Sequence, residues 1–463
     1  MTTFLVLGED FYNFMSGIFG TYDIRGLDGL EINTGFANKL GFAFGDYLLK
    51  QNARRVIVGH DSRVNSQAYG LNLADGLIES GLDVTFIGLT STPMLNYLSA
   101  NLDFCAGAMV TASHLSAKYN GFKLCGKNAN AIGCDSGLKE IERIYYQEPI
   151  RIGNKPGKLD HVSYIKNYLE FMQNYLANAS NLAIGVDSGH GSIYPEIVGL
   201  LDGKCRFIGI NNEPNGDFSL RPSNPLDKGA LDELSKMIVD LRLDFGAGFD
   251  GDGDRIIIID ELGRMVDPDI LTAIIAVRLL NTSSHEGGKV FYDLRSSKVV
   301  PELINNAGGL AQKCKVGHSF IKNTMQSESG LFAGEMSGHY YYQDLYNTDN
   351  ALRTLVEVIN IVSDLKNGNS TLGKLVDEYK KYSTSQEINF AVNDVHNIIA
   401  RLESQYNDGL IEKLDGLTIN YPNWWFNARP SQTEPMLRLR LEAYDSHSLK
   451  LKLSELENII TNS

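Results

Sequence analysis

Residues 108–124 have the sequence Ala-Met-Val-Thr-Ala-Ser-His-Leu-Ser-Ala-Lys-Tyr-Asn-Gly-Phe-Lys-Leu. The small and apolar residues 105–110 predict a buried strand that leads into this stretch. The apolar run breaks at Thr111-Ala-Ser-His114, and Tyr119-Asn-Gly121 predicts a turn. A hydroxyl at the point where a strand runs out into a turn is exposed and rigidly held, which is a common setting for a nucleophile. Ser113 is therefore a candidate nucleophile, and a polar hairpin tip is the alternative interpretation.

Two basic side chains accompany Ser113. His114 is its neighbour, and Lys123 follows ten residues later. Cationic donors of this kind stabilise a phosphorylated serine. The stretch therefore suits a serine that carries a phosphoryl group.

Length and composition limit the possible functions. A chain of 463 residues has room for three or four domains of about 100–150 residues each. The composition, 43% hydrophobic and 21% charged, is that of a globular protein. A net charge of -14 without a basic stripe argues against nucleic-acid binding as the main activity. Small anionic substrates remain possible, because a few arginines in one site outweigh a remote net charge.

The cysteines and the apolar runs indicate the cellular compartment in which we expect the protein. Five cysteines without a CxxC pair indicate a reducing compartment and argue against a zinc site. The first residues lack the basic and apolar regions of a signal peptide, and no apolar run approaches the roughly 20 residues that span a bilayer. We therefore expect a cytoplasmic protein that does not contact membranes.

Short apolar runs alternate with longer amphipathic stretches through most of the chain, which predicts α/β domains with mostly parallel sheets. Predicted strands cover residues 56–61, 84–88, 105–110, 182–187, 206–210, 245–249, 256–260 and 289–293, and predicted helices cover residues 67–80, 138–147, 161–176, 226–241, 270–280 and 350–365. Residues 148–160 have the composition of a linker, and a third unit is expected to open at Ile256. Three of the strands end on an aspartate, which hints at three copies of one topology.

The last 80 or so residues have a different pattern. Four predicted strands, 387–392, 417–421, 424–428 and 436–442, lie between or beside two predicted helices, 394–406 and 446–460. The strand 436–442 alternates cleanly between apolar and polar residues. This pattern predicts an α+β domain with an antiparallel sheet.

An acidic motif, Asp250-Gly-Asp-Gly-Asp-Arg255, follows a predicted strand. If the extended path continues, the three carboxylates lie on one side. Carboxylates so close together repel one another unless a cation lies among them, and hard oxygen ligands suit Mg²⁺. A solvated acidic turn is the alternative. A calcium-binding EF-hand is set aside because the flanking segments are predicted strands.

Two further polar loops are candidate binding sites. Gly334-Glu-Met-Ser-Gly-His339 presents a carboxylate and a hydroxyl that suit sugar hydroxyl groups, although a simple turn would look the same. Arg429-Pro-Ser-Gln-Thr-Glu-Pro435 combines a guanidinium with two hydroxyls, which suits an anion. A proline-rich loop without a ligand is the alternative.

Together these motifs resemble the ordered signatures of the α-D-phosphohexomutases, in particular the phosphomannomutase/phosphoglucomutase branch. The resemblance includes Gly20-Thr-Tyr-Asp-Ile-Arg-Gly26, and the motifs run in family order from residue 20 to residue 435. The resemblance implies a heart-shaped enzyme of four domains around one cleft. The first three are similar mixed-sheet α/β domains: 1–157 with the phosphoserine loop, 158–257 with the metal-binding loop and 258–373 with the sugar-binding loop. The fourth, 374–463, is a smaller C-terminal α+β domain with an antiparallel sheet that binds phosphate.

The resemblance also implies site residues. Ser113 matches the serine that carries the phosphoryl group, which is also a metal ligand. The Mg²⁺ ligands are Asp250, Asp252 and Asp254, and the polar groups around the phosphoserine are Arg25, His114, Lys123 and Arg255. The expected substrate-binding residues are Tyr22, Arg295, His318, Glu335, Ser337, His339, Arg429, Ser431 and Thr433.

The implied reaction interconverts hexose 6-phosphate and hexose 1-phosphate, of mannose or glucose, through a hexose 1,6-bisphosphate. Phosphoryl transfer depends mostly on positioning and charge stabilisation, so Mg²⁺ and the cationic side chains neutralise the moving group. Lys123 is the candidate general acid and base, because its pKa can shift among cations. We expect a monomer or weak dimer that binds hexose monophosphates and binds neither nucleic acid nor membranes.

The chain departs from the family pattern after the Ser-His pair, where Leu115-Ser116 replaces the usual Asn-Pro. The change removes a rigid proline from the loop. Two rival functions remain. A phosphoglucosamine mutase would differ mainly in the sugar loop, and a non-catalytic relative would lack Ser113 or the aspartates, all of which are present.

Overall fold

The computed structural model describes residues 17–147, 153, 155–281, 287–431 and 436–461, which fold into two compact units. The amino-terminal unit contains residues 17–266 and 337–373, and the carboxy-terminal unit contains residues 267–336 and 374–463.

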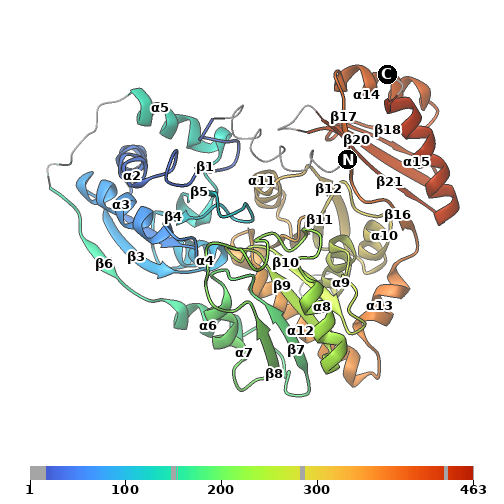
Figure 1. Ribbon diagram of the computed structural model, residues 1–463, viewed down its shortest axis with the longest axis horizontal. Helices are drawn as coiled ribbons and strands as arrows, with labels where there is room; N and C mark the ends of the chain where they lie inside the picture. The colour runs from blue at the N-terminus through green and yellow to red at the C-terminus, as the bar shows by residue number, and fades with distance from the viewer. Residues whose placement is uncertain (1–16, 148–152, 154, 282–286, 432–435, 462–463) are drawn as a thin grey trace. The chain divides into compact units, whose positions relative to one another are not determined.

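The amino-terminal unit begins with a mixed six-stranded sheet (Figure 1). Its order is β1 (Ile24–Leu27), β5 (Tyr119–Cys125), β4 (Ala106–Val110), β2 (Arg55–His60), β3 (Asp83–Leu89) and β6 (Leu159–His161). Strands β4, β2, β3 and β6 are parallel to one another, whereas β5 is antiparallel to both β4 and β1. The helices of this domain are α2 (Thr34–Leu49), α3 (Ser66–Glu79), α4 (Thr92–Asn101) and α5 (Lys139–Gln147).

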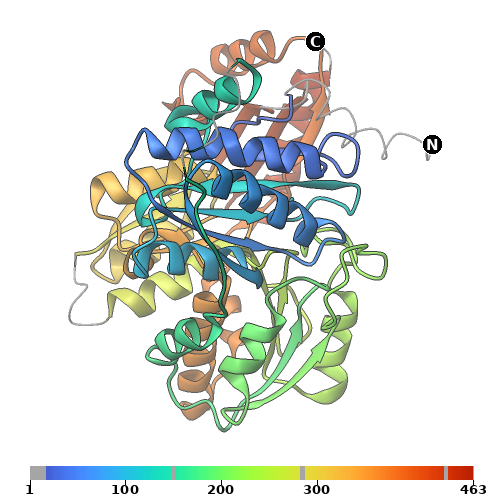
Figure 2. The same ribbon diagram turned by 90° about the vertical axis from the view of Figure 1, so that its left-hand side faces the viewer.

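Helices α2 and α3 lie side by side (Figure 2) because glycines allow a close approach. A Cβ atom on Gly41 would lie 2.3 Å from the backbone oxygen of Leu73, and one on Gly76 would lie 2.2 Å from that of Asn38. No side chain fits at such distances. The apolar faces of both helices bury a core that includes Val56, Val58, Leu40 and Leu73, while β4 is buried along its whole length.

A second sheet has the order β10 (Ile256–Asp260), β9 (Phe245–Phe249), β7 (Ala183–Asp187) and β8 (Arg206–Ile210). Strands β9, β7 and β8 are parallel, and β10 returns antiparallel to β9. The expected opening of a third unit at Ile256 is therefore wrong, because this strand completes the second sheet. Its helices are α6 (Ile165–Gln173), α7 (Tyr194–Leu201) and α8 (Asp232–Leu241), and α12 (Ala351–Asn367) packs against α6 and β10.

The segment 337–373 returns to this unit beside the start of β10. The backbone N–H of Ile256 donates to the carbonyl of Gly338 at 3.0 Å. An antiparallel pair follows, β14 (Tyr340–Tyr342) and β15 (Thr348–Asp349), joined through the short helix η3 (Gln343–Leu345). This return places His339 and Asp349 close to the loop after β9.

The carboxy-terminal unit contains parallel strands in the order β12 (Leu310–Cys314), β11 (Lys289–Asp293) and β13 (Phe332–Gly334). Their helices are α9 (Pro268–Leu280), α10 (Val299–Asn306) and α11 (His318–Glu328). Helix α13 (Leu372–Tyr379) then leads towards the last domain.

The last domain has a sheet whose pairs are all antiparallel (Figure 1). Strand β21 (Met436–Ala443) pairs with β16 (Ser383–Thr384), β17 (Ile388–Ala391) and β20 (Trp424–Pro430), and the sheet continues through β19 (Leu417–Asn420) to β18 (Leu410–Glu412). Helices α14 (Val395–Gln405) and α15 (Ser446–Thr461) cover its apolar core. The expected α+β domain is confirmed.

Four expectations about local structure are wrong. Residues 119–121 do not form a turn but begin β5, because Gly121 allows the backbone of Ile24 to approach within 2.0 Å of where a Cβ would be. The expected linker and the helix expected from His161 overlap β6, which pairs with β3. Helix α8 begins at Asp232 and not near residue 226, because turns precede it and Gly229 has a φ of +83°.

The repeated aspartates prove to share one structural role. Asp61, Asp187 and Asp293 follow or end β2, β7 and β11, are fully buried, and each accepts a hydrogen bond from the backbone N–H two residues later. Each also forms an ion pair with an arginine: Asp61 with Arg63, Asp187 with Arg221 and Asp293 with Arg295. Arg63 and Arg221 are buried, and Arg295 is half-buried. In the part of the chain that the structure describes, no helix is long and apolar enough to cross a membrane.

Candidate active site

Ser113 lies in the loop between β4 and β5. It has a φ of +52°, a left-handed conformation that is unfavourable for a residue with a side chain and is often found at functional sites. Its N–H donates to Oγ1 of Thr111 at 2.8 Å. Ser113 is only 1% exposed, so the expectation of an exposed hydroxyl is wrong. The loops of the second sheet cover it: Oγ of Ser223 donates to its carbonyl at 3.0 Å.

The Ser113 hydroxyl lies between a carboxylate and an imidazole. Its Oγ donates to Oδ2 of Asp250 at 3.2 Å and lies 3.4 Å from Nδ1 of His114. Burial, followed by the positive charges of Arg255 and Arg25, holds the pKa of His114 well below its usual range. The imidazole is therefore neutral at neutral pH.

The two arginines expected near Ser113 each have a carboxylate partner. Arg25, on β1, donates to Asp23 through Nε and Nη2, at 2.9 and 2.7 Å. Arg255 Nε lies 3.8 Å from Oδ2 of Asp250. Tyr22 is half-buried just before β1. The structure therefore brings Arg25 and Arg255 close enough to His114 to affect its pKa.

The acidic loop after β9 does not continue the extended path that we expected. Residues 251–253 form a turn in which Gly253 has a φ of +69°, and this turn brings the three carboxylates together. One oxygen each of Asp250, Asp252 and Asp254 lies within 4.8 Å of the others. All three side chains are buried.

The charge balance of this cluster suits a cation. Burial, and then the carboxylates of Asp254 and Asp252, raise the pKa of Asp250 well above its usual range. The Oδ1 atom of Asp252 is buried without a hydrogen-bond partner among the described residues. A hard divalent cation supplies both the missing partner and the missing charge, so the residues present fit a metal ion.

Lys123, on β5, is held by this cluster. Its Nζ lies 2.7 Å from Oδ2 of Asp252 and 2.5 Å from Oδ2 of Asp254. Burial lowers the pKa of Lys123, but the two carboxylates more than reverse this, and the pKa is raised. The expectation that Lys123 lies among cations, with a pKa free to fall, is therefore wrong.

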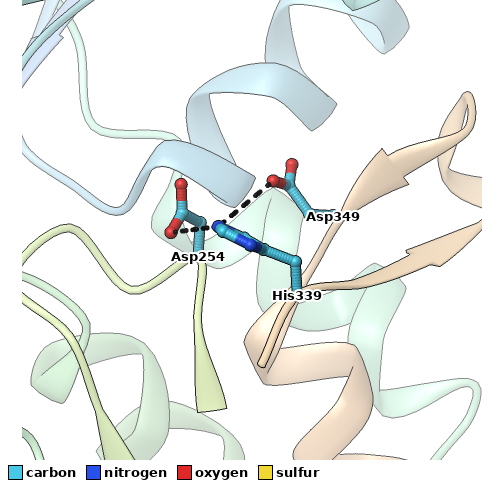
Figure 3. Close-up of side chains that lie close together, drawn as sticks. All are labelled: Asp254, His339 and Asp349. Atoms are coloured by element: carbon cyan, nitrogen blue, oxygen red, sulfur yellow. Dashed lines mark hydrogen bonds and ion pairs between the residues drawn. The ribbon is translucent and has the colours of Figure 1, made fainter. Parts of the chain in front are cut away.

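His339 lies between Asp254 and Asp349 (Figure 3). Its Nε2 is 3.2 Å from Oδ1 of Asp254 and 4.0 Å from Oδ2 of Asp349, and its Nδ1 is 2.9 Å from Oγ of Ser337. The three residues Asp254, His339 and Asp349 form a second group with the composition of a metal site, and it shares Asp254 with the first. His339 and Ser337 thus lie next to the acidic loop.

The other predicted residues belong to the carboxy-terminal unit. Glu387 accepts from Nη2 of Arg429 at 3.0 Å and from Nη1 of Arg295 at 3.3 Å, and its Oε1 lies 3.5 Å from Arg438. Burial opposes ionisation of Glu387, but Arg295 and Arg429 outweigh it and lower its pKa to about 2. Arg438 also donates to Oγ of Ser431 at 3.2 Å.

Three predicted residues remain. Glu335 accepts from the N–H of Gly317 at 3.1 Å. His318 is the first residue of α11. Thr433 lies outside the described residues.

Four residues that the structure brings to these groups were not predicted from the sequence. They are Arg63, Asp349, Glu387 and Arg438. Arg63 had a detectable signal, because Asp61-Ser-Arg63 and Asp293-Leu-Arg295 repeat one pattern after a strand. Asp349 and Glu387 lie outside the motifs, and Arg438 lies in the predicted strand that follows the motif 429–435, so no local pattern marks any of the three as a site residue.

Sequence models of the phosphoglucomutase/phosphomannomutase α/β/α domains I, II and III match residues 16–150, 160–263 and 267–382, in that order. The chain belongs to the phosphoglucomutase/phosphomannomutase family. The resemblance to α-D-phosphohexomutases and the expectation of three α/β domains followed by an antiparallel domain are thereby confirmed.

Members of this family match the chain over almost its full length. It is 37% identical to a phosphomannomutase of Methanocaldococcus jannaschii over 449 residues, which cover 96% of this chain and 97% of that protein. It is 32% identical to the phosphohexose mutases of Xanthomonas campestris pv. campestris, with coverage of 96% and 98%.

Solved structures of the family share the fold. A phosphoglucomutase/phosphomannomutase family protein from Burkholderia thailandensis matches with a TM-score of 0.86 and 25% identity, over 96% of this chain and 98% of that chain. Parafusin, a phosphoglucomutase from Paramecium, matches with a TM-score of 0.76 and 15% identity, over 95% of each chain, which shows a common fold.

Proposed function

We propose that this protein is a phosphohexomutase that interconverts the 6-phosphate and 1-phosphate of mannose, glucose or both. The observation that carries the proposal is the position of the Ser113 hydroxyl, 3.2 Å from Asp250 in a cluster of three buried carboxylates. A serine beside a cation site is suited to accept and donate a phosphoryl group, because the transferred group carries charge that a cation neutralises. Membership of the phosphoglucomutase/phosphomannomutase family supports the same chemistry.

In this proposal, phosphorylated Ser113 transfers its phosphoryl group to a free hydroxyl of a hexose monophosphate. The bond between phosphorus and Oγ breaks, a bond to the sugar oxygen forms, and the proton that the sugar hydroxyl loses is balanced by the proton that Oγ of Ser113 gains. The resulting hexose 1,6-bisphosphate then returns its other phosphoryl group to Oγ of Ser113. The net result moves the phosphate from one sugar carbon to another.

Asp250, Asp252 and Asp254 would hold Mg²⁺, which when bound supplies positive charge close to the transferred group. Arg25 and Arg255 add fixed positive charge on the side of His114. The ammonium group of Lys123 contacts Asp252 and Asp254, so we assign it the role of electrostatic partner of the transferred group in place of a general base. Arg295, Arg429, Arg438 and Ser431 would bind the phosphate that is not reacting.

Intact mass spectrometry tests the phosphoserine. The wild-type protein should contain a fraction heavier by one phosphoryl group, and this fraction should be absent from Ser113→Ala but present in Ser116→Ala. Turnover by a fully unphosphorylated enzyme without added bisphosphate would rule out the proposed route.

Coupled assays test the substrates. Mannose 1-phosphate and glucose 1-phosphate should both react, with kcat/KM values within about 100-fold, because one altered hydroxyl contact is worth about 1–3 kcal/mol. If glucosamine 6-phosphate proves the best substrate, the assignment to mannose and glucose is wrong.

A further inference from the structure

Arg63 lies in the loop after β2. Its guanidinium group contacts the Ser113 loop at backbone carbonyls only. Its Nη2 donates to the carbonyls of Ser113 and Leu115, at 2.8 and 2.6 Å. Its Nη1 donates to those of Ser116 and Tyr119, at 2.8 and 2.9 Å. The Nε donates to Oδ2 of Asp61 at 3.1 Å. These bonds use all five N–H groups of a guanidinium.

No other side chain type can make this set of contacts. A lysine has three donors on one atom and lacks the planar fork, so it cannot reach four carbonyls and a carboxylate together. Arg63 is 4% exposed and Asp61 is fully buried. Loss of the guanidinium would leave buried carbonyls and a buried carboxylate without partners, which is costly.

The Ser113 loop needs such an anchor. Leu115 and Ser116 leave the backbone dihedral angles freer than a proline would. Ser113 itself adopts an unfavourable left-handed conformation, which persists only where the surroundings enforce it. The carbonyls that Arg63 binds span this loop from Ser113 to the first residue of β5.

A segment of the second domain closes over the anchor. The ring of Phe218 lies 5.0 Å from the Arg63 guanidinium carbon. Gly216 lies so close that a Cβ atom there would be 2.3 Å from Cα of Arg63. Ser223, in the same segment, supplies the second hydrogen bond to the Ser113 carbonyl. The anchor is thus shielded from water, which strengthens its hydrogen bonds.

We propose that Arg63 is the positioning residue of the phosphoserine loop: with Asp61 as counter-ion, it fixes the backbone of residues 113–119 so that the Ser113 hydroxyl is held at the carboxylate cluster. This inference rests on the proposed function for its kinetic readout. Arg63 bonds to no side-chain atom of Ser113, so it acts through the backbone and not on the reacting atoms.

Arg63→Lys tests the proposal. We expect kcat to fall about 100-fold, because a displacement of the nucleophile by about 1 Å has an effect of this size. KM should stay within about threefold of the wild-type value, since the side chains proposed to bind substrate are unchanged. Arg55→Lys, at the other end of β2, is the matched control and should have wild-type kinetics. A folded Arg63→Lys enzyme with kcat within threefold of wild type would overturn the proposal.

A second substitution separates positioning from general stability. Ser116→Pro restricts the loop while keeping the carbonyl that Arg63 binds. In the Arg63→Lys background it should raise kcat at least tenfold, whereas in the wild type it should change kcat less than threefold. If it raises the melting temperature of the double variant without restoring kcat, Arg63 is only a structural residue and the proposal is wrong.

Amide hydrogen exchange gives a readout that does not depend on activity. The amides of residues 112–119 should exchange at least tenfold faster in Arg63→Lys than in the wild type, and unchanged exchange would overturn the proposal.

If Arg63→Lys fails to fold, Ser223→Ala removes one donor to the same carbonyl and should lower kcat three- to tenfold with faster exchange in this loop. No change in either quantity would overturn it. A wild-type enzyme inert towards all hexose phosphates would contradict the proposed function, while the exchange experiment would still test Arg63.

Discussion

The ammonium nitrogen of Lys123 lies 2.7 Å from Oδ2 of Asp252, and this contact links β5 of the first domain to the acidic loop of the second. The lysine thus contributes a positive charge to the site that we propose for Mg²⁺. Like charges repel, so the ammonium group of Lys123 should weaken the binding of Mg²⁺ at this site.

Replacement of Lys123 by glutamine should separate these two contributions. We expect kcat to fall by about 100- to 1,000-fold at saturating Mg²⁺, the usual cost of losing one charge-stabilising group. The Mg²⁺ concentration that gives half-maximal activity should fall, because a competing positive charge has been removed. A Mg²⁺ titration of activity measures both quantities. Lys127→Gln, an exposed lysine nearby, is the control, and a higher half-saturating Mg²⁺ concentration would contradict this account.

Asp252→Asn should lower kcat by at least about 100-fold, since it removes a carboxylate charge from the proposed metal site. In the wild type, EDTA should abolish activity and Mg²⁺ should restore it. Asp240→Asn on the exposed face of α8 changes the net charge equally and should leave kcat unaltered. Activity that is indifferent to chelation would show that the carboxylate cluster does not hold a required metal ion.

Arg438→Gln should raise KM about tenfold with little change in kcat. Arg438 lies beside Glu387 and Ser431, where we propose that the non-reacting phosphate binds. A charge-assisted hydrogen bond made equally in the ground and transition states is worth about 1.5 kcal/mol and affects KM alone. Steady-state kinetics of this variant and of Arg401→Gln, an exposed arginine in the same domain, check the prediction. A large fall in kcat at constant KM would place Arg438 in the chemical step instead.

Glu196 should make stability depend on pH. Its carboxylate accepts from the N–H and hydroxyl of Ser91, at 2.9 and 2.8 Å, but burial outweighs these bonds and raises its pKa to about 7. Because the folded state then binds a proton more tightly than the unfolded state, this group favours folding at low pH. The contribution is complete below the unfolded pKa of 4.5 and is lost as the pH rises through about 7.

The free energy of unfolding should therefore fall by about 1.4 kcal/mol per pH unit in this range, on account of this group alone. Glu196→Gln cannot ionise and should lose this part of the pH dependence. Urea unfolding of wild type and variant between pH 5 and 8 measures the difference. Glu233→Gln, which removes an exposed carboxylate, serves as control, and identical pH profiles for wild type and Glu196→Gln would disprove the prediction.

The sequence by itself determined the fold class and the residue types of the site. Strands β9, β10 and β11 have the predicted bounds, because continuous apolar runs between polar loops have few other ways to be buried. The strand β21 was predictable from its alternating residues, since one face of an antiparallel sheet is buried and the other is not. The motifs around Ser113, Asp250 and Arg429 were visible as local patterns, and together they identified the family.

Only the tertiary structure decided the environment of each side chain. The pattern around Lys123 suggested neighbouring cations, but folding places its ammonium between Asp252 and Asp254, which are 129 and 131 residues away in sequence. The hydroxyl of Ser113 was expected to be exposed, but the segment that carries Ser223 buries it. Electrostatic and packing energies depend on distance in space, and a local sequence pattern contains no information about which distant residue will be close. For the same reason, the sequence marks Arg63 only as part of a repeated motif, whereas the fold places its guanidinium against the carbonyls of the Ser113 loop.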